Sequence, residues 1–426
     1  MTGNCGSSSA PVSAENIDHL KNLLSIGTSE YPDDMINWTS YEKYFEYTNS
    51  CGKTMNVHFM VGHNALRIAV MGMENRPSTP KELDMMKGLL KEAMQSGAAG
   101  FSTGLIYTPG CYATPDEVLE LAKVIAPFDG IYASHIRNEA EGVVESVREV
   151  IDIGRRAGVR TNISHHKVLG KKNWGKQRET LELIERANAC MPPWHLEGGY
   201  DALSEKLKSK EFRAQLKAEM ENPATPYDNF LLNAGGWDGV YVTYTANTPQ
   251  AKGKYISEYA RLVNKDPWDA YFDMCVENNC SVCAVYSSMC DEDVCEIFKS
   301  LYCVVGTDGL ARSLEDDGHP SACASFPHAL TYFVKEKKIV TLEEAIRKMT
   351  GLTADYLNVK NKGYIKENYD ADLVILDFDK LRDTATYDKP ISYAEGINRV
   401  IVGGETVYKD MKLTGKYSGK VIRYRA

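Results

Sequence analysis

The chain has 426 residues, a formal charge of −9 at pH 7, and apolar and charged fractions of 43% and 25% that are ordinary for a globular protein. The negative charge, with no Lys/Arg block to offset it, argues against nucleic acid as a main partner, and no apolar run approaches the roughly 18 residues of a membrane span. The N-terminus has neither the basic flank nor the apolar stretch of a secretory signal, so we expect a cytoplasmic protein.

Strands and helices are predicted to alternate from residue 55 to about residue 186, after two helices at 15–25 and 40–50. Thr79-Pro80-Lys81-Glu82 and Thr114-Pro115-Asp116-Glu117 each place Thr at an N-cap, Pro at the first helical position and Glu at the third. This alternation predicts a parallel α/β sheet or barrel. The predicted strands are 55–61, 98–102, 130–133 and 159–163, and the helices are 79–97, 114–125, 139–157 and 179–189.

The alternation breaks at residues 190–194, Cys-Met-Pro-Pro-Trp, because this stretch cannot form a buried strand. Beyond residue 357 short alternating strands predict a small β module. We therefore expect a barrel domain at 1–357 with a helical insertion at about 200–280, and a C-terminal module at 358–426. The elements predicted in this half are helices at 203–221, 249–279, 291–301 and from 341, and strands at 230–244, 281–286, 302–305, 371–376, 399–402 and 405–408.

Four residues that suit a metal site follow predicted strands or lie in glycine-rich loops. His135 and His165 end two strands joined by a helix, and such a βαβ unit makes the strands parallel neighbours with their carboxyl ends at one rim. Cys5 and Asp308 add a thiolate and a carboxylate. This set suits Zn²⁺, and Asp308 is alternatively a base that takes a proton from water.

Lys167 lies two residues after His165 and is expected at the same rim, where it would meet an anionic substrate group or form a salt bridge to Glu139 or another acid. His166 is expected on the opposite face, because side chains alternate along a strand.

The eleven cysteines, an odd number in a chain without an export signal, favour reduced thiols over a disulfide framework. Cys275, Cys280 and Cys283 share the C-x4-C-x2-C spacing of plant-type iron–sulfur proteins. No glycine-rich loop accompanies this spacing, so we prefer small buried residues over a cluster site. Dinucleotide, P-loop, zincin and G-x-S-x-G motifs are absent from the sequence.

Seven segments resemble the N-acyl-D-amino-acid deacylases (D-aminoacylases) of the amidohydrolase superfamily, which are metal-dependent TIM-barrel hydrolases. The resemblance covers nearly the whole chain in matching order. The segments are TGNCGSSSAP (2–11), VGHNALR (61–67), GFSTGLIYTPGCYA (100–113), SHIRNE (134–139), ISHHKVLGKKNWGK (163–176), GTDGL (306–310) and GYIKENYDADLVILD (363–377).

The resemblance implies an incomplete (β/α)8 barrel with a small C-terminal β-sandwich module. It implies that Cys5, His135 and His165 hold one zinc ion, with Asp308 as the general base near the metal-bound water. Lys167 is implied to bind the carboxylate of the substrate, a small N-acyl amino acid. The implied reaction is hydrolysis of a linear amide bond, most simply deacylation of an N-acyl-D-amino acid.

Three departures from the family accompany this resemblance. The chain starts at the Cys motif, so the first barrel strand and its His-x-His pair, which binds the second metal, are missing. An Asp-x-Tyr-Pro-Tyr strand expected near residues 189–191 is missing, and the family's His-Pro-Arg reads His319-Pro320-Ser321. We expect an incomplete product of an enzyme lineage, whose activity the missing segments would impair.

Three alternatives stay open from the sequence. The first is a cyclic-amide hydrolase of the dihydropyrimidinase or dihydroorotase type, although the strand at 98–102 lacks the bridging Lys of those enzymes. The second is a catalytically inactive metal-binding remnant. The third is a thiol hydrolase that uses Cys5 with His135, but it leaves Asp308 and His165 without roles. An oligomer is compatible with every one of these readings.

Overall fold

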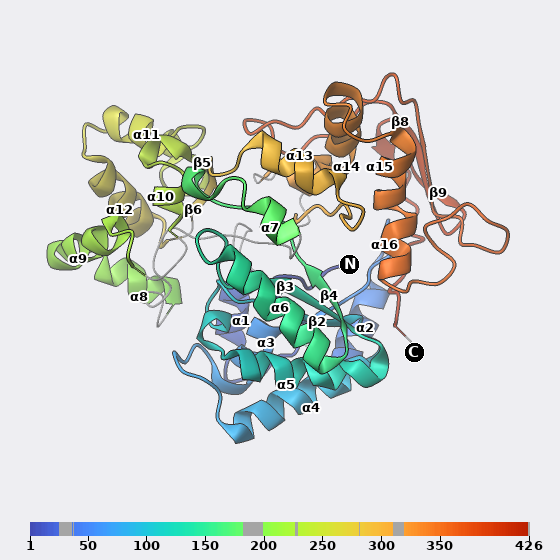
Figure 1. The fold of residues 1–426 in the computed structure, drawn as a ribbon, viewed down its shortest axis with the longest axis horizontal. Helices are drawn as coiled ribbons and strands as arrows, with labels where there is room; N and C mark the ends of the chain where they lie inside the picture. The colour runs from blue at the N-terminus through green and yellow to red at the C-terminus, as the bar shows by residue number, and fades with distance from the viewer. Residues whose placement is uncertain are drawn as a thin grey trace. The chain divides into compact units, whose positions relative to one another are not determined.

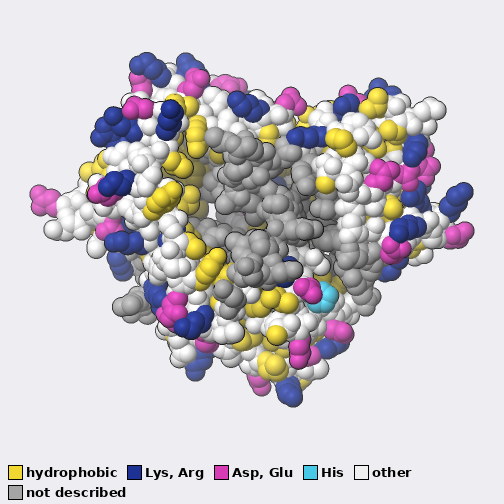
Figure 2. Space-filling view, turned by 180° about the vertical axis from the view of Figure 1, so that it is seen from behind, with side chains coloured by type: hydrophobic (Ala, Val, Ile, Leu, Met, Phe, Trp, Pro, Cys, Tyr) yellow, Lys and Arg dark blue, Asp and Glu magenta, His cyan; other side chains and the backbone are white. Residues whose placement is uncertain are grey.

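The computed structural model describes residues 1–24, 36, 38–181, 199–225, 229–280, 282–309 and 319–424. These form two compact units: unit 1 contains Met1–Tyr44 and Phe59–Val294, and unit 2 contains Phe45–His58 and Cys295–Tyr424. Acidic and basic side chains are interspersed over the face shown in Figure 2. Within the described part of the chain, no helix combines the length and the apolar character that crossing a membrane requires. The domain division at residue 357 stays a prediction.

Unit 1 is built around a parallel sheet of four strands in the order β1-β2-β3-β4, which confirms the predicted parallel α/β core (Figure 1). Each of the first three strands is followed by a helix or helices that return the chain to the start of the next strand, and consecutive helices α3 to α6 pack against one another. The strands are β1 (Val61–Gly62), β2 (Gly100–Gly104), β3 (Ile131–His135) and β4 (Arg160–Ile163), and the helices are α3 (His63–Met71), α4 (Pro80–Ser96), α5 (Pro115–Ile125) and α6 (Val143–Ala157).

Helix α4 begins with the capping box that its sequence predicts. The hydroxyl of Thr79 accepts a hydrogen bond from the backbone N–H of Glu82 (3.3 Å), and the Glu82 carboxylate accepts one from the backbone N–H of Thr79 (2.7 Å). Two backbone donors at the helix start are thereby satisfied. The Glu82 carboxylate also pairs with Arg76, and both of these interactions hold the pKa of Glu82 down at about 2.

Thr79→Ala is expected to lower the free energy of unfolding by about 1 kcal/mol, because an N-cap hydroxyl is lost while the helix itself is kept. Chemical denaturation measures the change. Thr79→Ser, which keeps the hydroxyl, is the matched control. An alanine variant as stable as the serine variant would show that the cap contributes nothing.

Helix α5 begins with the same Thr-Pro-x-Glu sequence, but its glutamate has a different role. The Thr114 hydroxyl caps the backbone N–H of Glu117, whereas the Glu117 carboxylate turns inward to His63 and Arg67. Its oxygens lie 2.7 and 2.8 Å from Nη1 of Arg67 and 2.9 Å from Nε2 of His63, and all three side chains are buried. This buried cluster joins the start of α3 to the start of α5.

Burial and charge act in opposite directions on this cluster. Burial by itself would raise the pKa of the Glu117 carboxyl, but the hydrogen bonds and charges of His63 and Arg67 outweigh it and hold that pKa far below its ordinary value. Burial lowers the pKa of His63, against the opposing pull of Glu117. The carboxylate is therefore ionised and fixed between its partners.

Several predicted elements differ from the structure. The strand expected at 55–61 is reduced to Val61–Gly62, and helix α3 directly after it was not predicted. Residues 302–305 form no strand. The carbonyl oxygens of Ser300 and Cys303 instead accept hydrogen bonds from Nζ of the buried Lys348 side chain. The strand expected at 281–286 is present, but it pairs antiparallel rather than continuing the parallel sheet. The break at 190–194 lies outside the described residues.

The remainder of unit 1 is mainly helical, as predicted for residues 200–280, and its buried apolar side chains form one hydrophobic core together with Ile106, Ala140 and Leu169. Two antiparallel strands, β5 (Val240–Thr245) and β6 (Val282–Tyr286), accompany the helices. Cys275 belongs to this core and Cys280 packs against it, which supports the interpretation of these cysteines as packing residues. The helices are α7 (Gln177–Leu181), α8 (Gly199–Lys206), α9 (Lys210–Glu221), α10 (Phe230–Asn233), α11 (Ile256–Leu262) and α12 (Pro267–Glu277).

Unit 2 contains the predicted short strands as one antiparallel sheet in the order β10-β9-β8-β7. The C-terminal residues run beside residues 53–57, with the backbone N–H of Val57 donating to Lys420 and that of Ile422 donating to Val57. The strands are β7 (Leu373–Leu376), β8 (Ile397–Val402), β9 (Glu405–Lys409) and β10 (Lys412–Leu413), and helices include α14 (Ser321–His328), α15 (Leu342–Met349) and α16 (Gly351–Tyr356).

Candidate metal centre

Two parallel strands bring His135 and His165 to the same rim, as the sequence predicts. His135 is the last residue of β3, and Ser134 of β3 lies opposite Ile163 of β4 in the sheet register. The backbone N–H of Ser164 donates to the carbonyl of Ser134 (2.9 Å), so the ladder continues one residue past β4. His165 therefore follows at the carboxyl end of the sheet, beside His135.

Cys5 reaches this rim from a loop that lies on the ends of β1 and β2. The carbonyl of Gly6 accepts from the backbone N–H of Asn64 (2.9 Å), and the backbone N–H of Gly6 donates to the Ser102 hydroxyl (3.2 Å). The loop approaches Gly104 so closely that a Cβ there would collide with the carbonyl oxygen of Cys5. A glycine at this strand end is therefore required for the loop to seat.

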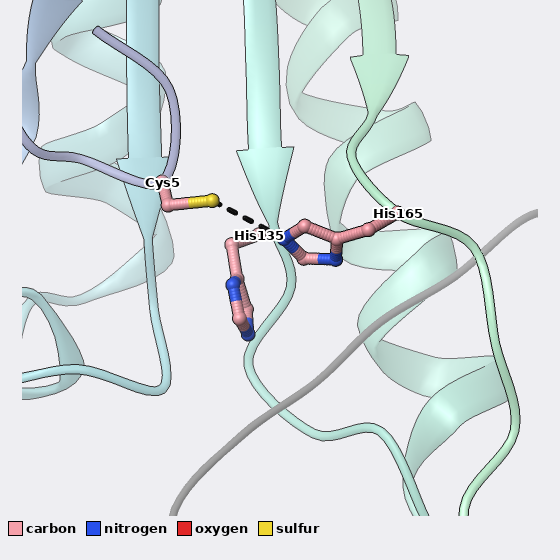
Figure 3. A group of neighbouring side chains, drawn as sticks. All are labelled: Cys5, His135 and His165. Carbon is pink, nitrogen blue, oxygen red and sulfur yellow. Dashed lines mark hydrogen bonds between the residues drawn. The ribbon is translucent and has the colours of Figure 1, made fainter. Parts of the chain in front are cut away.

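The Cys5 thiol and the His165 ring point toward each other, and the His135 ring lies beside them (Figure 3). Their metal-ligating atoms all lie within 4.8 Å of one another, and Sγ of Cys5 is 3.2 Å from Nε2 of His165. The rings of His135 and His165 meet edge to face with centroids 4.3 Å apart. His135 is fully buried, whereas Cys5 and His165 are partly exposed.

Two members of this group have a strained backbone. Cys5 and His165 have φ angles of 54° and 42°, a region that non-glycine residues seldom occupy. Such a conformation costs on the order of 1–3 kcal/mol and persists where the surroundings impose it, often at functional sites. Asp308, in unit 2, shares this feature with φ of 46°. The same backbone region is also occupied by residues outside the site, such as Asp129 and Asp410, so it does not by itself distinguish the site.

The geometry and chemistry of the group suit one zinc ion. A thiolate and two imidazoles are ligands that Zn²⁺ prefers, and bonds of about 2.0–2.3 Å in a tetrahedron place ligand atoms about 3.3–3.8 Å apart. The observed spread of up to 4.8 Å, and the 3.2 Å contact between Cys5 and His165, need only small side-chain adjustments to reach those values. Three protein ligands would leave a coordination position for substrate or water.

Lys167 lies at the rim beside His165, as predicted. Its Nζ atom is 3.2 Å from Nδ1 and 3.2 Å from the carbonyl oxygen of the same histidine. The side chain is partly buried, so its ammonium group is held next to the metal-ligand cluster. His166 does not belong to that cluster, and β4 ends at Ile163, so both histidines lie beyond the strand rather than alternating along it.

Asp308 lies in unit 2, in the segment Gly306-Thr307-Asp308-Gly309, and its side chain is exposed. Its roles as general base and as a further metal ligand stay predictions, as does the role of Lys167 in binding a carboxylate. Arg312 and residues 310–318 lie outside the described residues. His319 is described, and its Nδ1 accepts a hydrogen bond from the backbone N–H of Ser321 (3.1 Å).

Two contacts of His135 were not expected from the sequence. The ring of Tyr107 packs edge-on against the imidazole with centroids 4.5 Å apart, and an oxygen of the fully buried Glu139 carboxylate lies 3.4 Å from Nε2. Glu139 follows His135 by four residues, and residues at this spacing contact each other within a helix. Glu139, however, lies in the loop between β3 and α6. Sequence alone offered no signal for this loop conformation.

Comparisons with known proteins support the family resemblance. Residues 303–408 match a model described as the amidohydrolase family. The chain is 34% identical over 425 residues to a D-aminoacylase of Alcaligenes xylosoxydans xylosoxydans, covering 99% of this chain and 80% of that protein. It is 32% identical over 430 residues to an N-acyl-D-aspartate deacylase of the same organism, covering 99% and 78%.

Solved structures of D-amino-acid deacylases are also similar to this chain. The crystal structure of a D-aminoacylase matches with a TM-score of 0.76 and 29% identity, covering 99% of this chain and 82% of the other. An N-acyl-D-glutamate deacylase from Bordetella bronchiseptica, complexed with zinc and a phosphonate mimic of the tetrahedral intermediate, matches with a TM-score of 0.77 and 29% identity, covering 100% and 82%. The parallel sheet of unit 1 is therefore part of an amidohydrolase-type barrel.

Proposed function

The chain belongs to the D-aminoacylase family of amidohydrolases, and we propose that it hydrolyses N-acyl-D-amino acids to D-amino acids and carboxylates with one zinc ion. The observation that carries this proposal is the convergence of Cys5, His135 and His165 at one end of a parallel sheet. A D-aminoacylase structure is described in terms of one-metal activation and second-metal attenuation, and this is compatible with a single zinc site.

The proposed mechanism uses a metal site, a general base and a group that binds the substrate carboxylate. Cys5, His135 and His165 would hold one zinc ion, which would supply a Lewis acid for the amide carbonyl and the attacking water. Asp308 takes the proton from the attacking water and passes it to the leaving amine nitrogen, so the carboxylate is regenerated after each turnover. The Lys167 ammonium pairs with the substrate carboxylate and orients the acyl group toward the cluster.

We also propose a cytoplasmic location and a small-molecule N-acyl amino acid substrate, with an oligomer compatible with both. The N-acyl-D-amino acid is the sole partner that the site chemistry requires, and the small β module at 358–426 is proposed to complete a composite sandwich. D-aminoacylase and the D-aspartate and D-glutamate deacylases are similar to this chain to nearly the same degree, at 32–34% identity. An assay on several substrates therefore has to decide which amino-acid side chain the site prefers.

The experiment measures bound metal and hydrolysis together. Purified protein is loaded with Zn²⁺ and assayed on N-acetyl-D-methionine, N-acetyl-D-aspartate and N-acetyl-D-glutamate, with N-acetyl-L-methionine as the stereochemical control. Hydrolysis of a D substrate that a chelator abolishes and Zn²⁺ restores is the expected result. Zinc binding without hydrolysis of any of them would contradict the enzymatic proposal and favour the inactive remnant. Hydrolysis of dihydrouracil instead would favour a cyclic-amide hydrolase.

His165→Ala is expected to weaken zinc binding by about a hundredfold. A structural zinc site with four ligands is worth about 10–16 kcal/mol, so one ligand contributes on the order of 3 kcal/mol. Competition with a chromophoric chelator measures the dissociation constant. His166→Ala, the adjacent histidine outside the cluster, is the control and should bind zinc like the wild type. Equal losses in both variants would contradict the assignment of His165 as a ligand.

A further inference from the structure

An open cavity of about 510 Å³ lies in unit 2 beside the π-helix η7 (Ala329–Glu336), which directly follows α14. This volume falls in the range of small-molecule sites in proteins. One wall of the cavity is formed by the π-helix and the residue Lys338 after it, and the other wall is the segment 378–382, which follows β7. The metal-ligand residues of unit 1 line no part of this cavity.

The helix that forms the first wall has an uncommon backbone. The backbone N–H of Lys337 donates to the carbonyl of Tyr332 (2.8 Å), five residues earlier, which is the bonding pattern of a π-helix. Such helices are rare, and where they occur they are frequently part of a functional site. In this chain the π-helix carries two of the lining residues, Val334 and Lys335. An uncommon helix and a cavity of ligand size therefore coincide in the same part of unit 2.

Part of the cavity lining is apolar. Leu381 is fully buried in a hydrophobic cluster of unit 2, and Val334 and Phe378 pack against that cluster while they remain partly exposed. Apolar surface that a ligand removes from water contributes favourably to binding. A ligand of this cavity is therefore expected to have an apolar body.

Two cations of the lining bind the same pair of backbone carbonyls. Nζ of Lys335 donates to the carbonyls of Asp379 (3.3 Å) and Leu381 (3.1 Å), and Nη1 of Arg382 donates to the same two carbonyls (2.7 and 2.8 Å). Because both nitrogen atoms bond the same oxygen atoms, they lie within about 6 Å of each other, where two positive charges repel. Nζ of Lys335 is also 4.7 Å from the centre of the Phe378 ring, which places this charge beside the apolar surface.

No carboxylate of the described residues forms an ion pair with Lys335, Lys338 or Arg382, all of which line the cavity. The acidic residue of the lining, Asp379, is exposed and pairs with none of them. An anion between Lys335 and Arg382 would offset their repulsion and accept charge-assisted hydrogen bonds from both. The charge of the lining therefore favours an anionic group on the ligand.

We propose that this cavity binds an apolar carboxylate, a molecule in which a hydrocarbon chain ends in one carboxylate group. The carboxylate oxygens accept hydrogen bonds from Lys335 and Arg382, and the chain covers Val334 and Phe378. The carboxylates that the proposed deacylation releases belong to this chemical class. The binding itself does not depend on the zinc centre, because none of the lining residues is a proposed metal ligand.

Calorimetric titration of the purified, zinc-loaded protein with octanoate tests the proposal. Octanoate is expected to bind, whereas octylamine, which has the opposite charge, and acetate, which has no chain, should bind at least about tenfold more weakly. Absence of octanoate binding, or equal binding of octylamine or acetate, would overturn the proposed chemistry. N-octanoylglycine carries the same chain and charge, and its affinity relative to octanoate distinguishes an acylated amino acid from a free fatty carboxylate as the source.

Removal of zinc with a chelator separates this proposal from the proposed function. Octanoate binding should be unchanged in the zinc-free protein, whether or not the loaded protein hydrolyses an N-acyl-D-amino acid. Loss of octanoate binding together with the metal would place the ligand at the zinc centre and overturn the proposed cavity site.

Lys335→Gln and Arg382→Gln are each expected to weaken octanoate binding about 10- to 100-fold, because each removes a hydrogen bond to a charged group. Lys337→Gln is the matched control: Lys337 follows the same helix, lies over the Tyr332 ring (5.2 Å) and does not line the cavity. The control should bind octanoate within about threefold of the wild type. An equal loss in the control would assign the binding to general positive charge rather than to the cavity.

A measurement on the wild type decides the question if the variants fail to fold. In protein with labelled methyl groups, octanoate is expected to shift the methyl resonances of Val334 and Leu381, which line the cavity. Shifts confined to Val168 and Leu169, which follow Lys167 in the chain, would place the ligand near the metal centre and contradict the proposal.

Discussion

Asp308→Asn is expected to lower kcat for the D substrate by about 10²–10⁴-fold while leaving zinc bound. The factor is that of a positioned general base, because an amide cannot take the proton from the attacking water. Asparagine tolerates the left-handed backbone that Asp308 adopts, with φ of 46°, so the loop should be retained. Steady-state kinetics and metal analysis on the same preparation measure both parts of the prediction.

Asp410→Asn is the matched control for this variant. Asp410 is also an exposed aspartate of unit 2 with a left-handed backbone, with φ of 53°, but it lies in the turn between β9 and β10. It should leave kcat and metal content unchanged. A loss of zinc in Asp308→Asn would assign Asp308 as a metal ligand. Activity equal to that of the control would remove Asp308 from the mechanism.

Glu117→Gln is expected to destabilise the protein by about 3–5 kcal/mol. The substitution removes the charge that compensates Arg67, whose guanidinium is fully buried and 2.7 Å from the carboxylate, and it weakens the bond to His63. Breaking a buried pair by removing one partner leaves an uncompensated charge in the interior, which explains the size of the effect. Denaturant unfolding at fixed zinc concentration measures the free energy.

Glu120→Gln on the same helix is the control. Its carboxylate pairs with Lys87 and Lys123 near the surface, where such pairs contribute about 0–1 kcal/mol. The two substitutions therefore make the same chemical change, one at a buried carboxylate and the other at a carboxylate near the surface. Equal destabilisation would mean that the buried cluster around Glu117 adds nothing beyond a surface pair.

The buried cluster also predicts how stability depends on pH. The pKa of Glu117 is depressed in the folded chain, so its contribution is present above the unfolded pKa of about 4.3 and is lost as the pH falls below that value. His63 acts in the same direction: burial lowers its pKa, so acid favours the unfolded chain, in which this imidazole can protonate. Wild type should therefore lose stability in acid more steeply than Glu117→Gln.

Much of unit 1 could be predicted from local signals. The apolar runs before His135 and His165, with an amphipathic helix between them, predicted a βαβ unit, and β3, α6 and β4 form it. Because parallel strands end at one rim, the two histidines also had to be neighbours. The antiparallel strands of unit 2 were predicted from alternating apolar residues and turn signals in the same way.

Other elements could not be predicted, because distant parts of the chain determine them. Tyr302-Cys303-Val304-Val305 reads as a strand, but no strand among the described residues pairs with it, and the carbonyl oxygen of Cys303 accepts a hydrogen bond from Nζ of Lys348. The run at 282–286 is a strand, yet its partner is β5 in antiparallel orientation. An apolar run specifies extended structure locally, whereas the partner strand is chosen by the whole fold.

The metal site shows the same division. The sequence by itself determined that two imidazoles meet at a strand rim, but Cys5 lies 130 residues from His135 along the chain, and no periodicity relates them. Only the seating of the Cys5 loop on Gly104 brings the thiol to the histidines. Contact between Glu139 and His135 depends likewise on a loop held by Leu169.

The two Thr-Pro-x-Glu helix starts show most clearly what the sequence determines and what only the tertiary structure decides. Sequence determined that Thr79 and Thr114 cap helices, because an N-cap bond involves only residues three apart. It gave no means to tell the two glutamates apart. Glu82 stays at the surface and closes a capping box, whereas Glu117 faces the buried cations of α3 and turns to them. A hydrogen bond between residues three apart can be predicted from the sequence, but the electrostatic environment of a side chain exists only once the fold has formed.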